Sequence, residues 1–254
     1  MEVLLAELPG GDYLGSAVLT HKPWNPESLL WLGCALMLAL APGAAVAGLF
    51  EDDSVSQMAA NVTVLPVAIL LAVFVWLQAN RRVYRVPLRL VEIFGFNRRN
   101  TGRCLQLGLA TGLGLVLIAM ALALVTSLLI QALGDQAEPQ KLVTLIAEEA
   151  AKPDQTGTLV FFVVMAAVVA PVVEEVLFRG ILYPAIKQIG YPHVATIGTA
   201  ILFALFHVNL LTFASLTAVA LALIALYEFT DNLLAPITAH AVFNASNLII
   251  LFWQ

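Results

Sequence analysis

The sequence predicts an all-α protein that crosses a membrane several times. Three observations predict this class: 61% of the 254 residues are hydrophobic, only 11% are charged, and the apolar residues fall into long runs. A soluble domain has about a quarter of its residues charged, whereas a membrane span needs about 20 mostly apolar residues. We therefore expect a polytopic membrane helix bundle that forms one integrated membrane domain.

Apolar runs along the chain predict about seven transmembrane helices. Five runs each predict one span: residues 29–50, 62–78, 105–133, 159–173 continuing into a pair of glutamates, and 232–253. Residues 188–227 contain no Asp, Glu, Lys or Arg, and this run of about forty residues is long enough for two spans with a break near Asn209. Residues 142–151 offer an eighth span, but the stretch is short and interrupted by polar residues, which favours an interfacial helix.

Basic residues are concentrated in one segment of the chain. Seven of the twelve Lys and Arg residues lie within residues 81–103, which places this loop in the cytoplasm by the positive-inside rule. The preceding acidic loop, residues 51–61, then faces outward, and the N-terminus is cytoplasmic. No basic face continues beyond the cluster, so we expect no nucleic-acid partner. The Ala- and Leu-rich composition, without an organellar signal, favours the plasma membrane of a prokaryote.

Ionisable residues in the second half of the chain interrupt segments that should lie in lipid. Each costs about 2.5–3.5 kcal/mol at the centre of a span. Glu175 and Arg179 are four residues apart, so they share a helix face and can form an ion pair. Glu174 is rotated by about 100° from its neighbour, which leaves it free of the arginine.

Two further helices carry groups suited to proton transfer or hydrogen bonding. His207 follows Phe203 by four residues, and His240 precedes Asn244 by four, so each pair shares a helix face. Taken singly, such residues more often serve as packed hydrogen-bonding groups between helices. Taken together, a carboxylate beside imidazoles can deprotonate a water, and Asn and His donors can stabilise an oxyanion. The set therefore predicts hydrolysis of a carbonyl group by an activated water.

Three short motifs, "EEVLFR", "FALFH" and "HAVFN", follow one another in this order. They match Glu-Glu-x-x-x-Arg, Phe-x-x-x-His and His-x-x-x-Asn, and over residues 159–247 the chain resembles the CAAX prenyl protease and bacteriocin-processing family of intramembrane proteases (CPBP or ABI). The resemblance implies a helical core, residues 159–254, with a conical cavity reached from the cytosol and the lipid. Residues 1–158, with the basic loop 81–103, form the N-terminal membrane helices.

The resemblance also implies a role for each motif residue. Glu174 would be the general base, and His207 would help to bind and orient the water. His240 and Asn244 would form the oxyanion site. Glu175 and Arg179 would be supporting residues, with Arg179 fixing either the helix or the carboxylate of the substrate.

A metal cofactor is not favoured, although the residues allow one. Glu174, His207 and His240 would make a His₂Glu zinc site, and the spacing in the sequence cannot decide because each comes from a different helix. Characterised members of the family favour a glutamate mechanism without metal. We therefore expect no cofactor, with divalent zinc as the alternative.

The expected partners are the lipid bilayer and a membrane-associated peptide or protein substrate. Eukaryotic relatives remove the last three residues of prenylated C-a-a-X proteins, whereas many prokaryotic relatives process other peptides or confer bacteriocin immunity. The sequence thus predicts an intramembrane endopeptidase and leaves open whether its substrate is prenylated. A proton-coupled transporter and a non-catalytic membrane scaffold or immunity protein are the alternatives.

Overall fold

The computed structural model describes residues 19–50, 54–86, 89–96, 100–136, 141–150, 152 and 156–253. Within these ranges the protein contains helices and no strand, which confirms the all-α class. The α-helices are α1 (Pro26–Ala47), α2 (Val55–Val83), α3 (Leu90–Ile93), α4 (Thr101–Ala132), α5 (Lys141–Ala150), α6 (Thr156–Val164), α7 (Ala170–Glu175), α8 (Tyr183–Gln188), α9 (Thr199–Leu205), α10 (Leu210–Thr230) and α11 (Leu234–Phe252). Three π-helical segments, η1 (Met165–Val169), η2 (Val176–Leu182) and η3 (Val194–Gly198), join some of them.

Five helices in the described part of the chain are long and apolar enough to cross a membrane. They are α2, α4, the continuous helix Thr156–Gln188 from α6 to α8, α10 and α11. Two shorter apolar helices, Glu27–Ala39 within α1 and Val194–Leu205 across η3 and α9, lie where the other two spans were predicted. The protein is thus a multi-pass membrane protein, but the count of seven spans is not confirmed. The candidate eighth span, residues 142–151, lies largely in α5. The ten residues of this helix are too few to span a bilayer.

Helix α2 begins earlier and ends later than its apolar run suggests. Ser54 caps it, because its side chain accepts a hydrogen bond from the backbone N–H of Gln57 at 3.1 Å, a standard way of starting a helix. At the other end Arg81 and Arg82 belong to its last turn, where cations offset the negative end of the helix dipole. Residues 55–61 of the acidic loop therefore belong to α2. Residues 51–53 lie outside the described residues.

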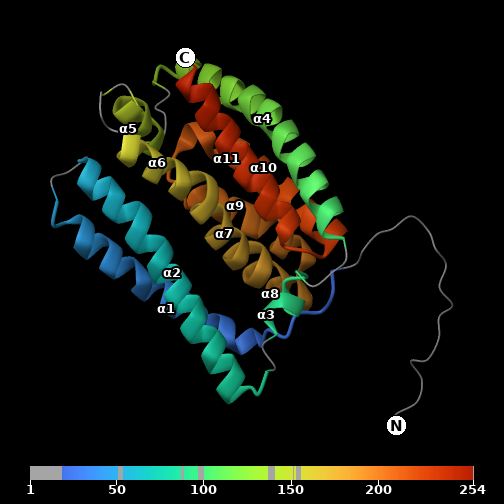
Figure 1. The fold of residues 1–254 in the computed structure, drawn as a ribbon. Coiled ribbons are helices and arrows are strands. Elements are labelled where there is room, and N and C mark those ends of the chain that lie inside the picture. Colours follow the sequence, from blue (N-terminus) through green and yellow to red (C-terminus); the bar gives the residue numbers. More distant parts are fainter. Residues whose placement is uncertain are drawn as a thin grey trace, which may run out of the picture.

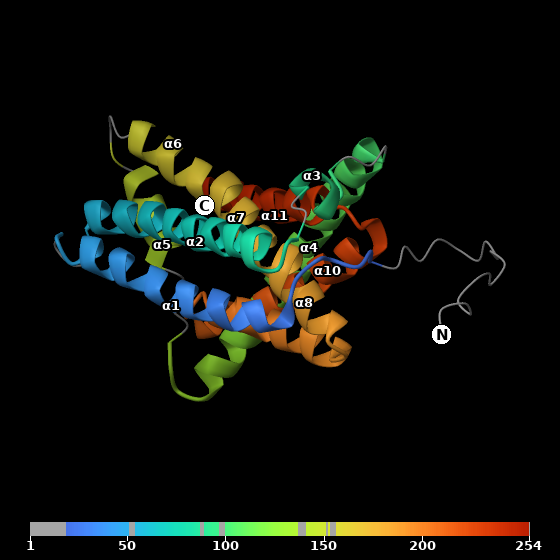
Figure 2. The same cartoon turned by 90° about the horizontal axis from the view of Figure 1, so that it is seen from below.

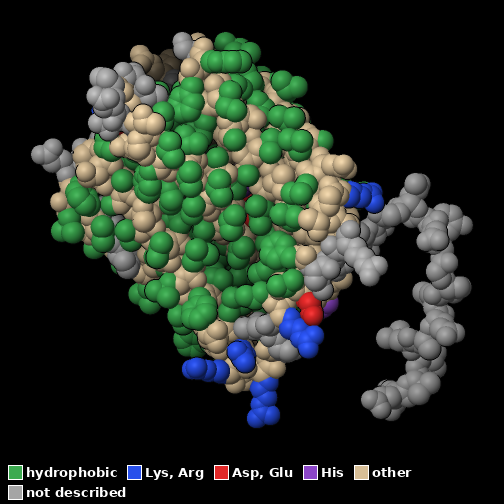
Figure 3. Space-filling model, in the orientation of Figure 1, with side chains coloured by type: hydrophobic (Ala, Val, Ile, Leu, Met, Phe, Trp, Pro, Cys, Tyr) green, Lys and Arg blue, Asp and Glu red, His purple; other side chains and the backbone are tan. Residues whose placement is uncertain are grey.

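Two groups of helices lie on either side of the Thr156–Gln188 helix. Helices α1 and α2 pack against each other as an antiparallel pair, and α4 packs along α10 and α11 (Figures 1 and 2). Helix α2 reaches the rest of the bundle through η1 and α7. Hydrophobic side chains cover most of the face in Figure 3, while Lys and Arg lie at its margin, most of them at the lower edge and one at the right edge. This distribution is the one expected for a bundle surrounded by lipid.

Helix α4 approaches α11 closely through two glycines. A Cβ atom at Gly108 would lie 2.7 Å from the Ala235 carbonyl oxygen, and one at Gly112 would lie 2.6 Å from that of Ala239. Small residues four apart allow helix backbones to pack closely in membranes. The spacing of these glycines therefore determines how near α11 lies to the rest of the bundle.

A buried ion pair connects the segment before α1 to the turn between α10 and α11. Lys22 is 1% exposed, and its Nζ lies 3.0 Å from Oδ1 of Asp231, which is 2% exposed. The ammonium also donates to the Ile93 carbonyl at 2.7 Å. Asp231 has a φ of 43°, in the left-handed region, as the residue that ends α10. These contacts join three parts of the chain at the end of the bundle that carries the basic segment.

Candidate active site

The Thr156–Gln188 helix carries the first motif, with one π-helical segment, η1, before it and a second, η2, that begins within it. Segment η1 ends two residues before Pro171, and η2 ends two residues before Pro184. Proline lacks an N–H and disrupts the α-helical hydrogen-bond ladder around it, so the chain accommodates each proline with a wider turn. Such π turns often occur at functional sites. Here they enclose α7, at the end of which lie Glu174 and Glu175.

Glu175 lies behind the cavity and is fully buried. Its Oε1 accepts hydrogen bonds from Nη1 of Arg179 and from Nδ1 of His240, both at 2.9 Å. Arg179, 1% exposed, donates through Nη2 to the Ala220 carbonyl at 3.1 Å. The ion pair predicted from the four-residue spacing therefore forms. The sequence did not predict that Glu175 also holds His240.

Glu174 points to a different side of the same helix, as its rotation from Glu175 predicts. It is 28% exposed and lines a cavity. Its Oε2 lies 3.8 Å from Nε2 of His240, longer than a direct hydrogen bond. The carboxylate is thus available to a molecule in the cavity, while Glu175 balances the charge of Arg179.

Both histidines are held through the same ring nitrogen. Nδ1 of His207 lies 2.9 Å from the Phe203 carbonyl oxygen, and Nδ1 of His240 contacts the carboxylate of Glu175. A carbonyl and a carboxylate accept hydrogen bonds, so Nδ1 carries the proton in each ring. This leaves Nε2 of each imidazole for the cavity, because both residues line it.

The ring of Phe203 contacts both histidines and Arg179. Its centroid is 5.0 Å from that of His207 and 5.7 Å from that of His240. The guanidinium carbon of Arg179 lies 4.7 Å from the same centroid, within the range of a cation–π contact. The phenylalanine of the second motif therefore fixes both imidazoles and covers the arginine.

Asn244, one turn after His240 on α11, is the fourth residue predicted to be catalytic. Its Nδ2 donates to the Ala166 carbonyl of η1 at 2.8 Å, which holds the amide against the π-helical segment. The second amide hydrogen and Oδ1 remain for other partners. All four residues predicted to be catalytic, Glu174, His207, His240 and Asn244, line one cavity. The structure therefore brings together groups from three helices.

The cavity has a volume of about 570 Å³, in the range of small-molecule and peptide-segment pockets. Besides the four motif residues, its wall consists mainly of apolar side chains. They come from the early part of α2, the later part of α4, α5, η1, α10 and α11: Val62, Leu65, Pro66, Ala119, Met120, Ala123, Val143, Ile146, Met165, Phe243, Leu248 and Leu251 among others. These parts of the helices lie away from the basic segment that joins α2 to α4. The cavity therefore extends from Glu174 toward the end of the bundle opposite the basic segment.

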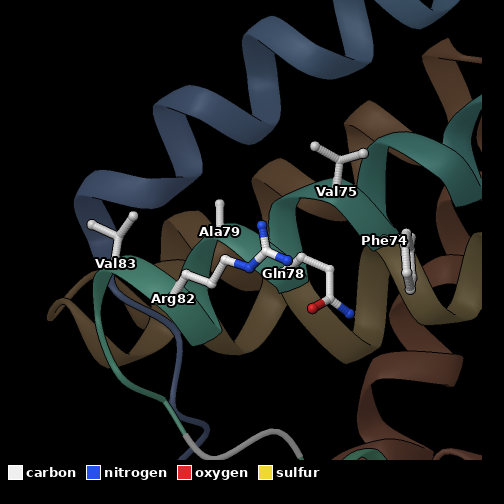
Figure 4. A pocket seen from close by; sticks show the side chains of 6 residues that line it. All are labelled: Phe74, Val75, Gln78, Ala79, Arg82 and Val83. Atoms are coloured by element: carbon white, nitrogen blue, oxygen red, sulfur yellow. The ribbon is translucent and has the colours of Figure 1, made fainter.

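A second hollow lies on the outer surface of α2 (Figure 4). One helix supplies its entire lining, Phe74, Val75, Gln78, Ala79, Arg82 and Val83. It contains no carboxylate or imidazole and shares no lining residue with the central cavity. The chemistry predicted from the sequence is thus restricted to the central cavity.

The described residues include no group of three His, Cys, Asp or Glu side chains arranged to hold a metal ion. Glu174, His207 and His240 share the cavity, but their spacing in this conformation does not meet that requirement. Arg179 is absent from the cavity wall. Its burial is consistent with fixing the helix, the first of the two roles predicted for it.

Comparison with known proteins agrees with this geometry. Residues 156–246 match the family model described as "Type II CAAX prenyl endopeptidase Rce1-like". No match was found among curated proteins or among solved structures. The match confirms the resemblance to the CAAX prenyl protease family, and it includes all six motif residues. Residues 156–246 are therefore similar to a family of CAAX prenyl endopeptidases, and they lie within a multi-pass helical protein.

Proposed function

From this Rce1-like core we propose that the protein is an intramembrane endopeptidase that hydrolyses a peptide bond in a membrane-associated peptide or protein. One observation carries the proposal. A carboxylate, Glu174, is exposed to an apolar cavity that it shares with His207, His240 and Asn244, while the adjacent Glu175 is buried against Arg179. Prenylated CAAX-type proteins are one substrate class that the family suggests.

The geometry supports a general-base mechanism. A water held between Glu174 and Nε2 of His207 gives a proton to the carboxylate as its oxygen attacks the scissile carbonyl carbon. The C–O bond forms and the carbonyl becomes an oxyanion. The C–N bond then breaks, and the proton passes from Glu174 to the leaving nitrogen, which restores the carboxylate.

His240 and Asn244 are placed to stabilise the oxyanion. Asn244 retains one amide hydrogen after its bond to Ala166. Donation from Nε2 of His240 requires a doubly protonated ring, in which the other N–H faces Glu175. In this proposal Glu175 and Arg179 position His240 and do not contact the substrate.

We propose no metal cofactor. The alternative is a zinc ion on Glu174, His207 and His240, and the two mechanisms respond differently to a chelator. Activity of the purified protein should survive chelator treatment, with no stoichiometric metal in elemental analysis. Loss of activity with the chelator and recovery with zinc would support the alternative.

We also propose that the N-terminus is cytoplasmic, in the plasma membrane of a prokaryote. The basic residues at one end of the bundle support this orientation by the positive-inside rule. With the basic end inside, the cavity extends toward the outer half of the membrane.

Comparative peptidomics of membranes tests the proposed activity. Peptides cleaved in the presence of the wild type should be absent with Glu174→Gln and with His207→Ala. The matched controls are Glu148→Gln and His193→Ala, because both residues are exposed and lie outside the cavity lining. Product formation by Glu174→Gln at the wild-type rate would refute the assigned role, provided that the variant is present in equal amount.

A further inference from the structure

We propose that Trp24, in the segment before α1, is a positioning residue for the candidate active site. It lies outside residues 156–246, which match the family model, and its indole N–H donates to the carbonyl of Gly180 at 2.9 Å. Gly180 directly follows Arg179 on the helix that carries the first motif. The inference rests on the proposed function and deepens it, because it gives the N-terminal part of the chain a role in the same site.

The carbonyl of Gly180 lacks its α-helical donor because of Pro184. In an α-helix each carbonyl accepts a hydrogen bond from the N–H four residues later. Four residues after Gly180 the chain has Pro184, and proline carries no N–H. Gly180 and Trp24 are both buried, so the carbonyl lies away from bulk solvent. A buried carbonyl without a partner is unfavourable, and the indole of Trp24 supplies the donor at this position.

The first π-helical segment has a comparable arrangement. Within η1 the N–H of Ala170 bonds to the carbonyl of Met165, five residues earlier. In the same register the carbonyl of Ala166 would pair with Pro171, which has no N–H, and Nδ2 of Asn244 donates to this carbonyl at 2.8 Å. A side chain of the third motif therefore replaces the donor that one proline removes, and Trp24 does the same at the second proline.

The indole of Trp24 is itself held by α1, α2 and the segment around it. Its ring centroid lies 5.2 Å from that of Trp76 on α2, and the two ring planes are tilted by 54°. The indole N–H of Trp76 donates to the Ser28 carbonyl of α1 at 2.7 Å. Two residues before Trp24, the buried Lys22 pairs with Asp231. The position of the indole is therefore fixed by contacts outside the candidate active site.

A change at Gly180 reaches the site through Arg179. Nη1 of Arg179 and Nδ1 of His240 both donate to Oε1 of Glu175, each at 2.9 Å. Without the indole N–H, the turn that contains Gly180 has to rotate toward another donor, and this rotation moves the backbone of Arg179. We therefore expect Trp24 to control the orientation of the His240 ring through this series of hydrogen bonds.

Three variants test the role of the indole N–H. Trp24→Phe keeps an aromatic ring against Trp76 and removes the donor. Trp24→Phe combined with Pro184→Ala restores a donor, because the new backbone N–H lies four residues after Gly180. Trp76→Phe is the matched control, since it also removes a buried indole N–H but one whose acceptor, Ser28, lies in α1.

Histidine-selective ¹⁵N NMR of the purified full-length protein in detergent micelles reads the site without a substrate. The Nδ1–H proton of His240 is identified by its loss in His240→Gln, and its acceptor is the buried Glu175. We expect Trp24→Phe to speed exchange of this proton with water by about tenfold or more, because exchange follows local opening. The double variant should restore the wild-type rate, and Trp76→Phe should leave it unchanged.

Turnover of a farnesylated C-a-a-X peptide that carries a fluorophore and a quencher gives a second readout. In Trp24→Phe kcat should fall by about tenfold to 10²-fold, because a small misplacement of a catalytic group has an effect of this size. KM should not change, since Trp24 does not line the cavity. The double variant should recover kcat, which a merely structural role of the tryptophan does not require.

Wild-type exchange at His240 together with wild-type kcat in Trp24→Phe would overturn the inference, whatever the stability of that variant. A loss that Pro184→Ala does not restore would overturn it as well. If Trp24→Phe does not fold, Pro184→Ala is compared with the double variant. Equal exchange at His240 in these two supports the inference, and failure of the double variant to fold contradicts it.

The proposed function has a separate outcome in the same experiment. Absence of cleavage that depends on Glu174 in the wild-type protein would count against the proposed function alone, because exchange at His240 is measured without a substrate and still decides the role of Trp24.

Discussion

The packing of α4 against α11 leads to a quantitative prediction for Gly112→Ala. The new Cβ would lie 2.6 Å from the Ala239 carbonyl oxygen and 2.8 Å from Cβ of Val242. Contacts below 3.4 Å are rare for a Cβ atom, so the helices must separate by about 0.8 Å at this point. Overpacking of this kind costs about 1–3 kcal/mol in the free energy of unfolding. The contact strains Ala239, the residue directly before His240.

The control is Gly114→Ala on the same helix, where nothing lies within 4 Å of the added Cβ. Both substitutions gain the same helix propensity, up to about 1 kcal/mol, so their difference isolates the contact with α11. Unfolding in mixed detergent micelles, followed by circular dichroism, measures this difference. Activity should also fall in Gly112→Ala, by up to about 10²-fold, because a shift of this order misplaces a catalytic group. Equal stability and equal activity of the two variants would show that the glycine does not set the helix distance.

Three further predictions follow from the buried charges and the orientation of the bundle. Glu175→Gln should lower the free energy of unfolding by about 3–5 kcal/mol, because it leaves a buried guanidinium without its carboxylate; unchanged stability in the micelle assay would contradict this. Lys22→Met should cost a similar amount, whereas Arg89→Met removes an exposed pair and should change stability by about 1 kcal/mol or less. In a cysteine-free background, single cysteines at Arg85 and Leu133 should react with an impermeant maleimide from opposite sides of the membrane, the first only after the cytoplasmic face is exposed. Labelling of the first cysteine in intact cells would reverse the proposed orientation.

Local spacing was sufficient to predict the charged part of the site. The ion pair between Glu175 and Arg179 and the separate direction of Glu174 both follow from the helical repeat of 3.6 residues. The helix continues through this region, so the repeat applies approximately even across the π turns. The same reasoning placed His240 and Asn244 on one face of α11, and both line the cavity.

Contacts between distant segments could not be predicted in this way. The hydrogen bond from His240 to Glu175 joins residues 65 positions apart, and the pair of Lys22 with Asp231 joins residues 209 apart. Neither leaves a periodic pattern in the sequence. The glycines of α4 do leave one, since Gly108 and Gly112 are four residues apart, a spacing that indicates close helix packing in membranes.

The number of spans was the weakest prediction because hydropathy measures composition and not helix continuity. Residues 188–227 are apolar throughout, and the chain breaks at residues 207–209, as predicted: Val208 has a φ of 46° and Asn209 caps α10. The helical part before this break, Val194–Leu205, is shorter than a span. The break is also what places His207 at the end of α9, where its side chain reaches the cavity beside Glu174.

The positions of the cavity and of the basic segment bring two expectations from the sequence into conflict. The positive-inside rule places the end where α2 stops and α4 starts in the cytoplasm. The family resemblance implies a cavity reached from the cytosol and the lipid. In this fold α2 and α4 contribute to the cavity from their other halves, through residues such as Leu65 and Met120. If the cysteine at Arg85 is cytoplasmic, this part of the cavity lies in the outer half of the bilayer, which favours entry of substrates from the lipid. If it is external, the basic segment does not determine the topology, and the cavity extends toward the cytosol as the resemblance implies.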